Sequence, residues 1–228
     1  FCYEILKAHY HKKNRNPEVN FFGIFFILLM MKFKTMKEQE ILIEFAKKHI
    51  EISTEDEEKI KKYFKVRNVE KNEILLNAGE VCNHLYFVVQ GILRTFHLNA
   101  NGTEFTRLIR KENQFCTVLL SFLEKKSSVA TIQALEKGVL LAISSEDFRT
   151  LTKESEIAQK IYTKTLEDFE NFHLKRLEFL TSYSPKEKTE IFLKEYHELE
   201  PRLADKVIAS YLQITPETYC RCKKSLES

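Results

Sequence analysis

The feature that most constrains the fold is a block of short apolar runs between residues 65 and 144, which turn residues interrupt at regular spacing. These runs are rich in β-branched and aromatic side chains, as strands are. The clearest of them are residues 84–89, 92–98, 104–109 and 139–144. Between the second and third stands Asn101-Gly102, which favours a hairpin with a type I′ turn because that turn needs positive φ angles. Many short strands at this spacing predict a barrel or jelly roll.

Helical periodicity flanks the block on both sides. Apolar residues recur at helical spacing within residues 37–63, where a second short helix is expected to open at Ser53. After Ser145 the pattern is helical throughout. It predicts one long helix over 155–182 and, after the break at Ser184-Pro185, shorter helices over 185–198, 203–211 and 216–226.

The long helix carries two apolar stripes, and such a helix has to bury itself against two surfaces. We expect one surface to be the chain's own β-domain and the other to be a second copy; a core helix in a monomer is the alternative. The first stripe supplies the candidate dimer contacts, which are Tyr162, Thr165, Phe169, Phe172, Arg176 and Phe179. The second stripe consists of Leu166, Phe169, His173, Leu177 and Leu180.

The most informative motif is residues 202–226, which have the spacing of a helix-turn-helix. Its first helix places the small residue Ala209 where two helices must cross closely. A short turn with Ile214 as a buried plug leads to Thr215, which caps the next helix, and Pro216 takes that helix's first position. In a helix-turn-helix, the second helix enters the major groove with its N-terminal residues at the base edges.

The second helix of this motif supplies the candidate DNA contacts. These are Thr215, Glu217, Thr218, Arg221, Lys223 and Lys224. Arginine suits the acceptors of guanine, glutamate suits the amino group of cytosine, and lysine suits phosphate. Residues 184–228 hold eight Lys and Arg against eight Asp and Glu. An ordinary helical hairpin with a charged face is therefore the alternative interpretation.

Composition and the cysteine positions limit which kinds of protein the chain can be. The chain has 228 residues, 43% of them hydrophobic, and a net charge of +3, which permits contact with nucleic acid without arguing for it. The five cysteines are scattered and form no CxxC pair, as is typical of reduced thiols in a cytoplasmic protein. We therefore expect no metal site, no cofactor and no membrane span.

The N-terminal segment differs from the rest of the chain. Residues 21–31 form an apolar run that is shorter than the roughly 20 residues a membrane span needs, and no small-residue cleavage site follows it. We expect the functional protein to begin at Met31 or Met36, with residues 1–36 as a non-native or disordered extension. A hydrophobic element that docks on the body is the alternative.

The order of parts resembles the cyclic-AMP receptor protein/fumarate-nitrate regulator (Crp/Fnr) superfamily of transcription regulators. The segments that carry the resemblance are residues 77–96, 132–144 and 208–226. It implies an α+β protein with a cyclic-nucleotide-binding-like β-roll (jelly roll) as sensor over 37–152. A dimerisation helix over 153–182 and a DNA-binding helix-turn-helix domain over 183–228 would follow. It also implies base contacts by Glu217 and Arg221.

Three departures from the family pattern bear on function. The cassette that holds a cyclic nucleotide has Gly-Glu and Arg-Ser pairs, where this chain has Thr117-Val118 and Ser127-Ser128. Without that arginine, and with only Lys125 or Lys126 as a substitute, cyclic AMP is not the expected effector. The family's iron–sulfur cysteine cluster is absent, and the chain ends at Ser228 without room for the usual β-wing.

The resemblance leads to one expected function and two alternatives. We expect a cytoplasmic, non-enzymatic homodimer that binds double-stranded DNA, with RNA polymerase as a further candidate partner. An unknown small effector would bind near residues 115–123. The candidate pocket residues are Phe115, Thr117, Val118, Leu119, Ser127 and Ser128. One alternative is a sensor that works through protein contacts without DNA. The other is a cupin-type metalloenzyme, against which stands the lack of a His-x-His pair at His84 or His97.

Overall fold

The computed structural model describes residues 38–227, so the expectation for residues 1–36 lies outside the described part of the chain. Two helices come first, α3 (Glu38–Lys47) and α4 (Thr54–Tyr63). Ser53 caps α4 as expected: its hydroxyl accepts a hydrogen bond from the Asp56 amide, and the Asp56 carboxylate accepts one from the Ser53 amide. This reciprocal capping box fixes where the helix begins.

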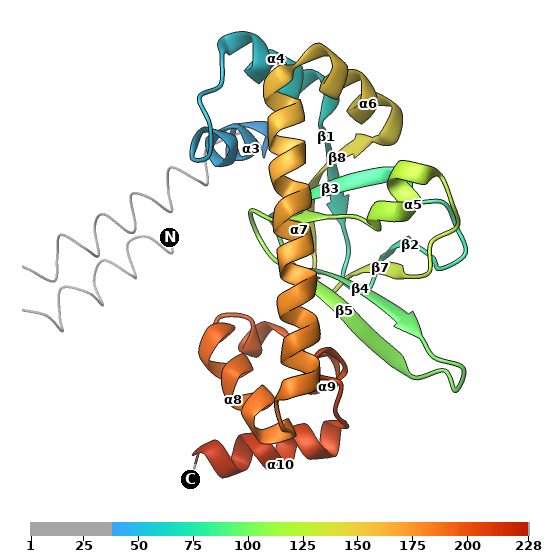
Figure 1. The fold of residues 1–228 in the computed structure, drawn as a ribbon, viewed down its shortest axis with the longest axis vertical. Helices are drawn as coiled ribbons and strands as arrows, with labels where there is room; N and C mark the ends of the chain where they lie inside the picture. Colours follow the sequence, from blue (N-terminus) through green and yellow to red (C-terminus); the bar gives the residue numbers. More distant parts are fainter. Residues whose placement is uncertain (1–37, 228) are drawn as a thin grey trace, which may run out of the picture. The chain divides into compact units, whose positions relative to one another are not determined.

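Two four-stranded antiparallel sheets follow and form the predicted β-roll (Figure 1). One sheet has the strand order β1-β8-β3-β6 and the other has the order β2-β7-β4-β5. The strands are β1 (Lys65–Val69), β2 (Ile74–Leu76), β3 (His84–Gln90), β4 (Leu93–Leu98), β5 (Glu104–Arg110), β6 (Phe115–Cys116), β7 (Thr131–Ala134) and β8 (Gly138–Ser144). A short helix, α5 (Leu119–Glu124), lies between β6 and β7.

The hairpin between β4 and β5 is confirmed, but its predicted type I′ turn is wrong. Of the two central residues only Gly102 has a positive φ, of 77°. The Asn99 side chain organises the loop instead: its Oδ1 accepts hydrogen bonds from the amides of Asn101 and Thr103, each at 2.9 Å. An asparagine that binds the backbone two residues ahead makes a longer loop stable without the I′ geometry.

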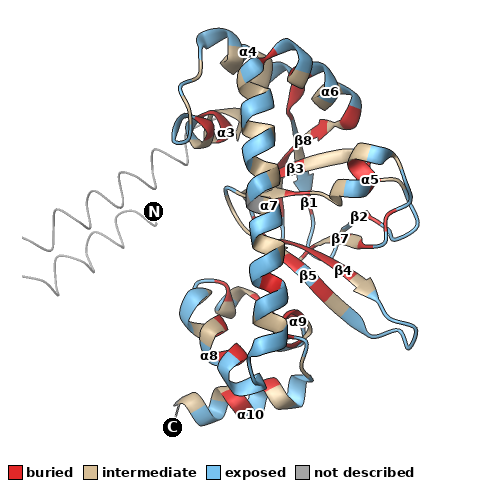
Figure 2. Cartoon of the chain, in the orientation of Figure 1, coloured by how far each residue is buried: buried red, intermediate tan, exposed pale blue. Residues whose placement is uncertain are grey.

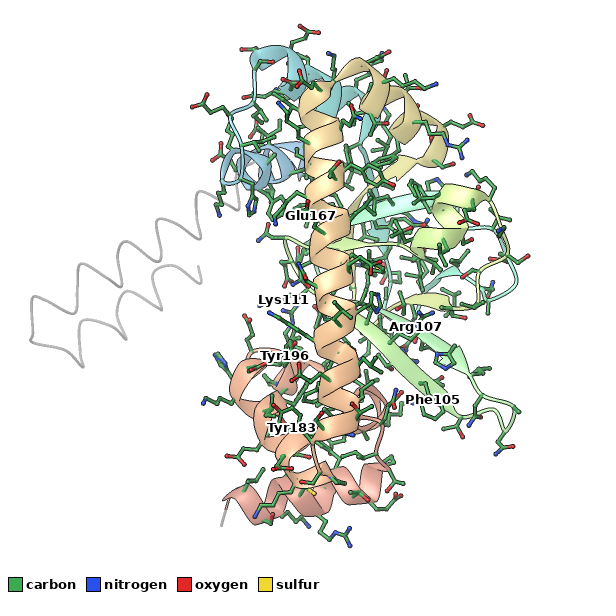
Figure 3. The ribbon with its side chains drawn as sticks, viewed as in Figure 1. Phe105, Arg107, Lys111, Glu167, Tyr183 and Tyr196 are labelled. Carbon is green, nitrogen blue, oxygen red and sulfur yellow. The ribbon has the colours of Figure 1, made fainter. Side chains whose placement is uncertain are left out.

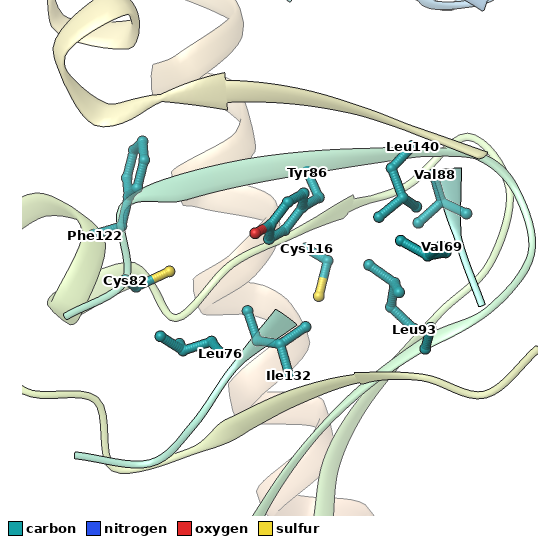
Figure 4. Close-up of a cluster of buried hydrophobic side chains, with 11 residues drawn as sticks. Val69, Leu76, Cys82, Tyr86, Val88, Leu93, Cys116, Phe122, Ile132 and Leu140 are labelled. Carbon is teal, nitrogen blue, oxygen red and sulfur yellow. The ribbon is translucent and has the colours of Figure 1, made fainter. Parts of the chain in front are cut away.

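The space between the two sheets is occupied by apolar side chains (Figure 4). Tyr86, Cys116, Ile132 and Leu140 each expose 2% of their surface or less. The hydroxyl of Tyr86 is reached by Arg67 at 3.1 Å, and burial raises the pKa of Tyr86 to about 12. The interior of the roll is therefore a hydrophobic core.

Helices make up the rest of the chain. They are α6 (Ser145–Glu154), the long α7 (Glu156–Ser182), α8 (Pro185–Glu195), the 3-10 helix η1 (Glu200–Arg202), α9 (Asp205–Leu212) and α10 (Pro216–Glu227). Figure 1 shows α7 running beside the β-roll, with α8, α9 and α10 gathered near its C-terminal end. A second apolar cluster joins these helices and includes Phe192, Ile208, Leu212 and Tyr219. None of the described helices is long and apolar enough to cross a membrane.

Polar contacts join the C-terminal helices to the β-roll. The Ser210 hydroxyl on α9 accepts a hydrogen bond from the Thr106 amide at 2.9 Å and donates one to the Glu104 carbonyl at 2.8 Å. Arg202 donates to both oxygens of Glu112, at 2.7 and 3.0 Å, and also pairs with Glu136. Because two nitrogens of the Arg202 guanidinium donate to the two oxygens of Glu112, this contact has the bidentate geometry of strong ion pairs.

Replacing Ile132 by alanine should test how tightly the roll is packed. The side chain is fully buried, so we expect Ile132→Ala to lower the free energy of unfolding by about 2–5 kcal/mol, through lost burial and the cavity left behind. Urea denaturation measures this loss. Val129→Ala removes a side chain that is 69% exposed and should change stability by no more than about 0.5 kcal/mol. Equal effects of the two variants would contradict a packed interior.

The Arg202 contact should make stability depend on pH. Burial raises the pKa of Glu112, but hydrogen bonds from Arg202 and the Gly91 amide outweigh it, so that the pKa lies below its usual 4.5. A carboxylate with a lowered folded-state pKa stabilises the protein above pH 4.5, and this stabilisation is lost as the pH falls further.

We therefore expect Arg202→Gln to flatten the fall of unfolding free energy below pH 4.5, as measured by urea denaturation at stepped pH. Arg149→Gln is the matched control, since Arg149 donates to the Leu123 carbonyl. An unchanged slope in Arg202→Gln would show that Glu112 does not depend on this partner.

Candidate functional site: a cavity between the β-roll and helix α7

The residues expected to hold an effector divide into two groups. Phe115, Thr117 and Leu119 line a cavity of about 340 Å³ between the roll and α7. Val118 instead packs partly buried against the core of the roll, and Ser127 and Ser128 belong to a loop that does not line this cavity. The predicted pocket is therefore not one continuous surface.

Backbone hydrogen bonds to residues 79–81 hold the loop at Ser128 in place. The Ser128 amide donates to the Glu80 carbonyl and the Gly79 amide donates to the Ser128 carbonyl, each at 2.7 Å. The Ser128 hydroxyl donates to the Ala130 carbonyl at 2.6 Å, and Ser127 forms an isolated β-bridge with Val81. Where the resemblance implies a phosphate site, this chain has a closed turn.

The two neighbouring lysines are engaged elsewhere. Lys125 ends α5 in the left-handed conformation, with a φ of 59°, and its ammonium group donates to Asn83 Oδ1 at 3.1 Å and to Ser145. Lys126 forms an ion pair with Glu124 at 2.6 Å. Both ammonium groups thus have partners within the protein.

The cavity itself is mostly apolar, and seven of its fifteen lining residues are aromatic. Its wall on the roll side comes from the end of β5, from β6 and from α5, and its opposite wall is the inner face of α7. The lining residues are Phe45, Leu85, Leu108, Arg110, Gln114, Phe115, Thr117, Leu119, Phe122, Phe148, Tyr162, Thr165, Leu166, Phe169 and Phe172. Apolar cavities of this size with few polar groups are typical ligand sites.

Arg110 is the functional candidate that sequence reasoning missed. Its guanidinium lies over the Phe172 ring at 5.0 Å from the centroid, and burial lowers its pKa. In the sequence it looks like one more charged residue at the end of a strand. Its position could be inferred only by knowing that the end of β5 meets α7.

The residues expected at a dimer interface lie largely against their own chain. Tyr162, Thr165, Phe169 and Phe172 line the cavity. Arg176, which is 8% exposed, lies 3.8 Å from the Tyr211 ring centroid and donates to the Tyr211 carbonyl; Phe179 packs on the C-terminal cluster. The stripe that was expected to contact a second copy therefore packs on the chain itself, as only one of the two stripes was expected to do.

The expected helix-turn-helix segment consists of two helices, α9 and α10, joined by a short turn. Helix α9 ends at Gln213 in the left-handed conformation, with a φ of 54°, and Ala209 is fully buried. Thr215 caps α10, since its hydroxyl accepts a hydrogen bond from the Thr218 amide at 3.2 Å. Ile214, expected as a buried plug, is only partly buried against the C-terminal cluster.

The six candidate DNA contacts differ in how available they are. Glu217, Arg221 and Lys224 are exposed on α10, and hydrogen bonds from its own amide and from Thr215 lower the pKa of Glu217. Thr215 and Thr218 bond to each other at the start of the helix. Lys223 is half-buried and pairs with Glu200, which raises the pKa of Lys223. The exposed side chains alternate with the buried Tyr219 and Cys222.

The two histidines weighed as metal ligands make ring contacts instead. His84 stacks on Tyr86 at 5.9 Å between ring centroids, and His97 stacks on Phe105 at 5.6 Å. Among residues 38–227, no three His, Cys, Asp or Glu side chains are grouped so that they could hold a metal ion.

A second cavity, of about 600 Å³, lies between α3, α4 and α7. Its lining is mainly aliphatic, with Leu42, Ile50 and Ile157 among its members. Its carboxylate, Asp56, already accepts hydrogen bonds from Ser53 at 2.5 Å and Ser155 at 2.7 Å. The first cavity is the stronger candidate because three of the six expected effector residues and the guanidinium of Arg110 line it.

Comparison with known proteins finds a family similarity over the β-roll. Residues 66–155 match the family model of the cyclic nucleotide-binding domain. No curated protein matches the chain.

Solved structures extend the likeness over most of the chain. FixK2 from Bradyrhizobium japonicum is 18% identical with a TM-score of 0.60, over 72% of this chain and 84% of that one. A Crp/Fnr-family transcriptional regulator from Eubacterium rectale is 21% identical with a TM-score of 0.64, over 77% and 84%. The c-di-GMP-responsive regulator CLP of Xanthomonas campestris is 16% identical with a TM-score of 0.61, over 77% and 92%. Residues 66–155 are therefore similar to the cyclic nucleotide-binding domain, and the chain has the fold of the Crp/Fnr family of regulators.

Proposed function

We propose that the chain is a Crp/Fnr-type transcription regulator, without catalytic activity, that binds specific double-stranded DNA sequences through α10. The observation that carries the proposal is the capped start of this helix, where Glu217 and Arg221 are exposed one turn apart. A side chain at each of these positions can reach base edges in a major groove, and the exposed Lys224 can reach a phosphate.

The proposed regulator is a homodimer that pairs along α7. The inner face of this helix packs on its own chain, whereas Leu174 and Leu177 on the helix are 66% and 62% exposed. Figure 2 shows much of the outer side of α7 as exposed. Pairing through this face would bury both leucines and give a twofold assembly with two copies of α10.

The cavity beside α7 is the proposed effector site. A ligand there would touch both the roll and the helix, so its binding energy could favour one arrangement of the two over another. Cyclic AMP is not the proposed effector, since Ser127 and Ser128 stand in place of Arg-Ser and the nearby lysines are engaged. As part of this proposal, the regulator acts in the cytoplasm and contacts RNA polymerase.

A second candidate function is a sensor that acts through protein contacts alone. It is favoured by the balanced charge of residues 184–228 and by the ion pair that ties Lys223 to Glu200. Selection of bound sequences from random duplex DNA by the purified full chain separates the two functions. An enriched palindrome with half-sites about 10 base pairs apart would establish the regulator. No enrichment, with or without metabolite extract, would favour the sensor.

Two substitutions on α10 should have different effects on DNA binding. Arg221→Ala should weaken binding to the selected sequence by about 1–3 kcal/mol and relax the preference at one base position. Lys224→Ala should weaken binding to all sequences alike and reduce the slope of log affinity against log salt by about 1. Fluorescence anisotropy over a series of salt concentrations measures both. Unaltered binding by Arg221→Ala would show that α10 does not read bases.

Charge on the outer face of α7 should prevent pairing. We expect the double change Leu174→Glu and Leu177→Glu to weaken dimerisation at least about tenfold, because the carboxylates would have to be buried. Sedimentation equilibrium measures the association. Leu120→Glu is the matched control, as Leu120 is 68% exposed on α5. If the double variant pairs as well as the unaltered chain, the interface lies elsewhere.

A further inference from the structure

The polar groups that line the α7 cavity are mostly satisfied by the protein itself. The Thr117 hydroxyl donates to the His84 carbonyl at 3.0 Å, and the Thr165 hydroxyl donates to the Ile161 carbonyl at 2.8 Å. The Gln114 side-chain oxygen accepts from the Lys111 amide at 3.1 Å. These hydrogen bonds hold the walls in place and use the protons of both threonine hydroxyls.

Among the described lining residues, Arg110 is the one with a buried polar side-chain atom that lacks a hydrogen-bond partner. Its Nε is buried without a hydrogen-bond partner. The charged or polar groups that act on it are the Cys116 thiol and the hydroxyls of Tyr196 and Tyr211, and no described carboxylate is among them. Partly burying a guanidinium without a counter-ion is costly, and beside apolar walls its charge attracts an anion more strongly than it would in open water.

We propose that the cavity binds a monoanionic apolar acid, with its carboxylate on Arg110 and its alkyl or aryl body among the aromatic side chains. The inference rests on the proposed sensor function of this site and adds the chemical class of the effector. A guanidinium can offer two parallel N–H groups to a carboxylate, which makes arginine well suited to bind one.

The shape of the cavity sets the orientation of such a ligand. Phe172, which contacts Arg110, and Tyr162 are ten residues apart on α7, which is about 15 Å along a helix that rises 1.5 Å per residue. The carboxylate would therefore lie toward the Phe172 end. The apolar body would extend toward Phe115, Phe148 and Tyr162, whose ring contacts with the ligand replace contacts with water.

The same features disfavour a nucleotide. A sugar phosphate brings several hydroxyl groups that need partners, and the threonine hydroxyls and the Gln114 side-chain oxygen of this cavity already bond within the protein. A buried polar group without a partner costs binding energy, so the cavity discriminates against such ligands. An apolar acid brings one charged group, which Arg110 satisfies.

Calorimetric titration of the full chain without DNA tests the proposal. The probes are octanoate and phenylbutyrate, each compared with its neutral amide, and cyclic AMP. We expect at least one acid to bind at least about tenfold more tightly than its amide, as the loss of a charged hydrogen bond implies. No binding of either acid up to about 1 mM, equal affinity for acid and amide, or tighter binding of cyclic AMP would overturn the proposal.

Two arginine variants locate the contact. Arg110→Gln should abolish the preference for acid over amide, and its melting temperature without ligand should stay the same or rise because an unpaired buried charge is gone. Arg107→Gln is the control: Arg107 is exposed on the same strand (Figure 3), and its loss should leave the preference intact. An acid preference that survives in Arg110→Gln would overturn the assignment.

The ligand titration and the DNA selection can fail independently of each other. If Arg110→Gln does not fold, the comparison of acids with amides on the unaltered chain still decides the ligand class. A chain that selects a DNA palindrome but binds neither acid refutes this inference alone. A chain that binds an acid but no DNA refutes the regulator and keeps the ligand site.

Discussion

The packing of one face of α7 is the constraint on which the rest of the structure depends. At its N-terminal half this face closes the aromatic cavity against the roll, and at its C-terminal half Arg176 and Phe179 pack on α9. Arg176 lies between the rings of Phe179 and Tyr211 and donates to a backbone carbonyl, so its charge is held by aromatic faces and a dipole. Because a single helix packs on both parts, α7 is the element that connects the roll to the C-terminal helices.

Most of the fold was predictable because local chemistry and tertiary packing agree. Strand β3, helix α7 and the cap at Ser53 lie within a residue or two of their expected bounds, since the alternation of apolar residues and the capping side chains act over a few neighbours. The type of the turn at Asn101-Gly102 was wrong because the nearby Asn99 binds the loop backbone. The short strands β2 and β6 have too few residues to show a period.

The candidate site was only half predictable for a related reason. A segment that forms a ligand site in related folds can be located in sequence, but which of its side chains face the cavity depends on distant partners. Val118 turns into the core of the roll, Ser128 bonds to the turn at Gly79, and Lys223 bonds to Glu200. Arg110 is a candidate because it packs on Phe172, which belongs to another element, α7. Such long-range pairings leave no local pattern.

The hydrogen bonds of Ser210 have a consequence for the integrity of the roll. Strand β5 is at the edge of its sheet, and the Thr106 amide and the Glu104 carbonyl both bond to Ser210 on α9. An uncovered edge strand is a template for pairing with other chains. Helix α9 therefore acts as a shield: a roll freed of its C-terminal helices would expose this edge and would tend to self-associate through it.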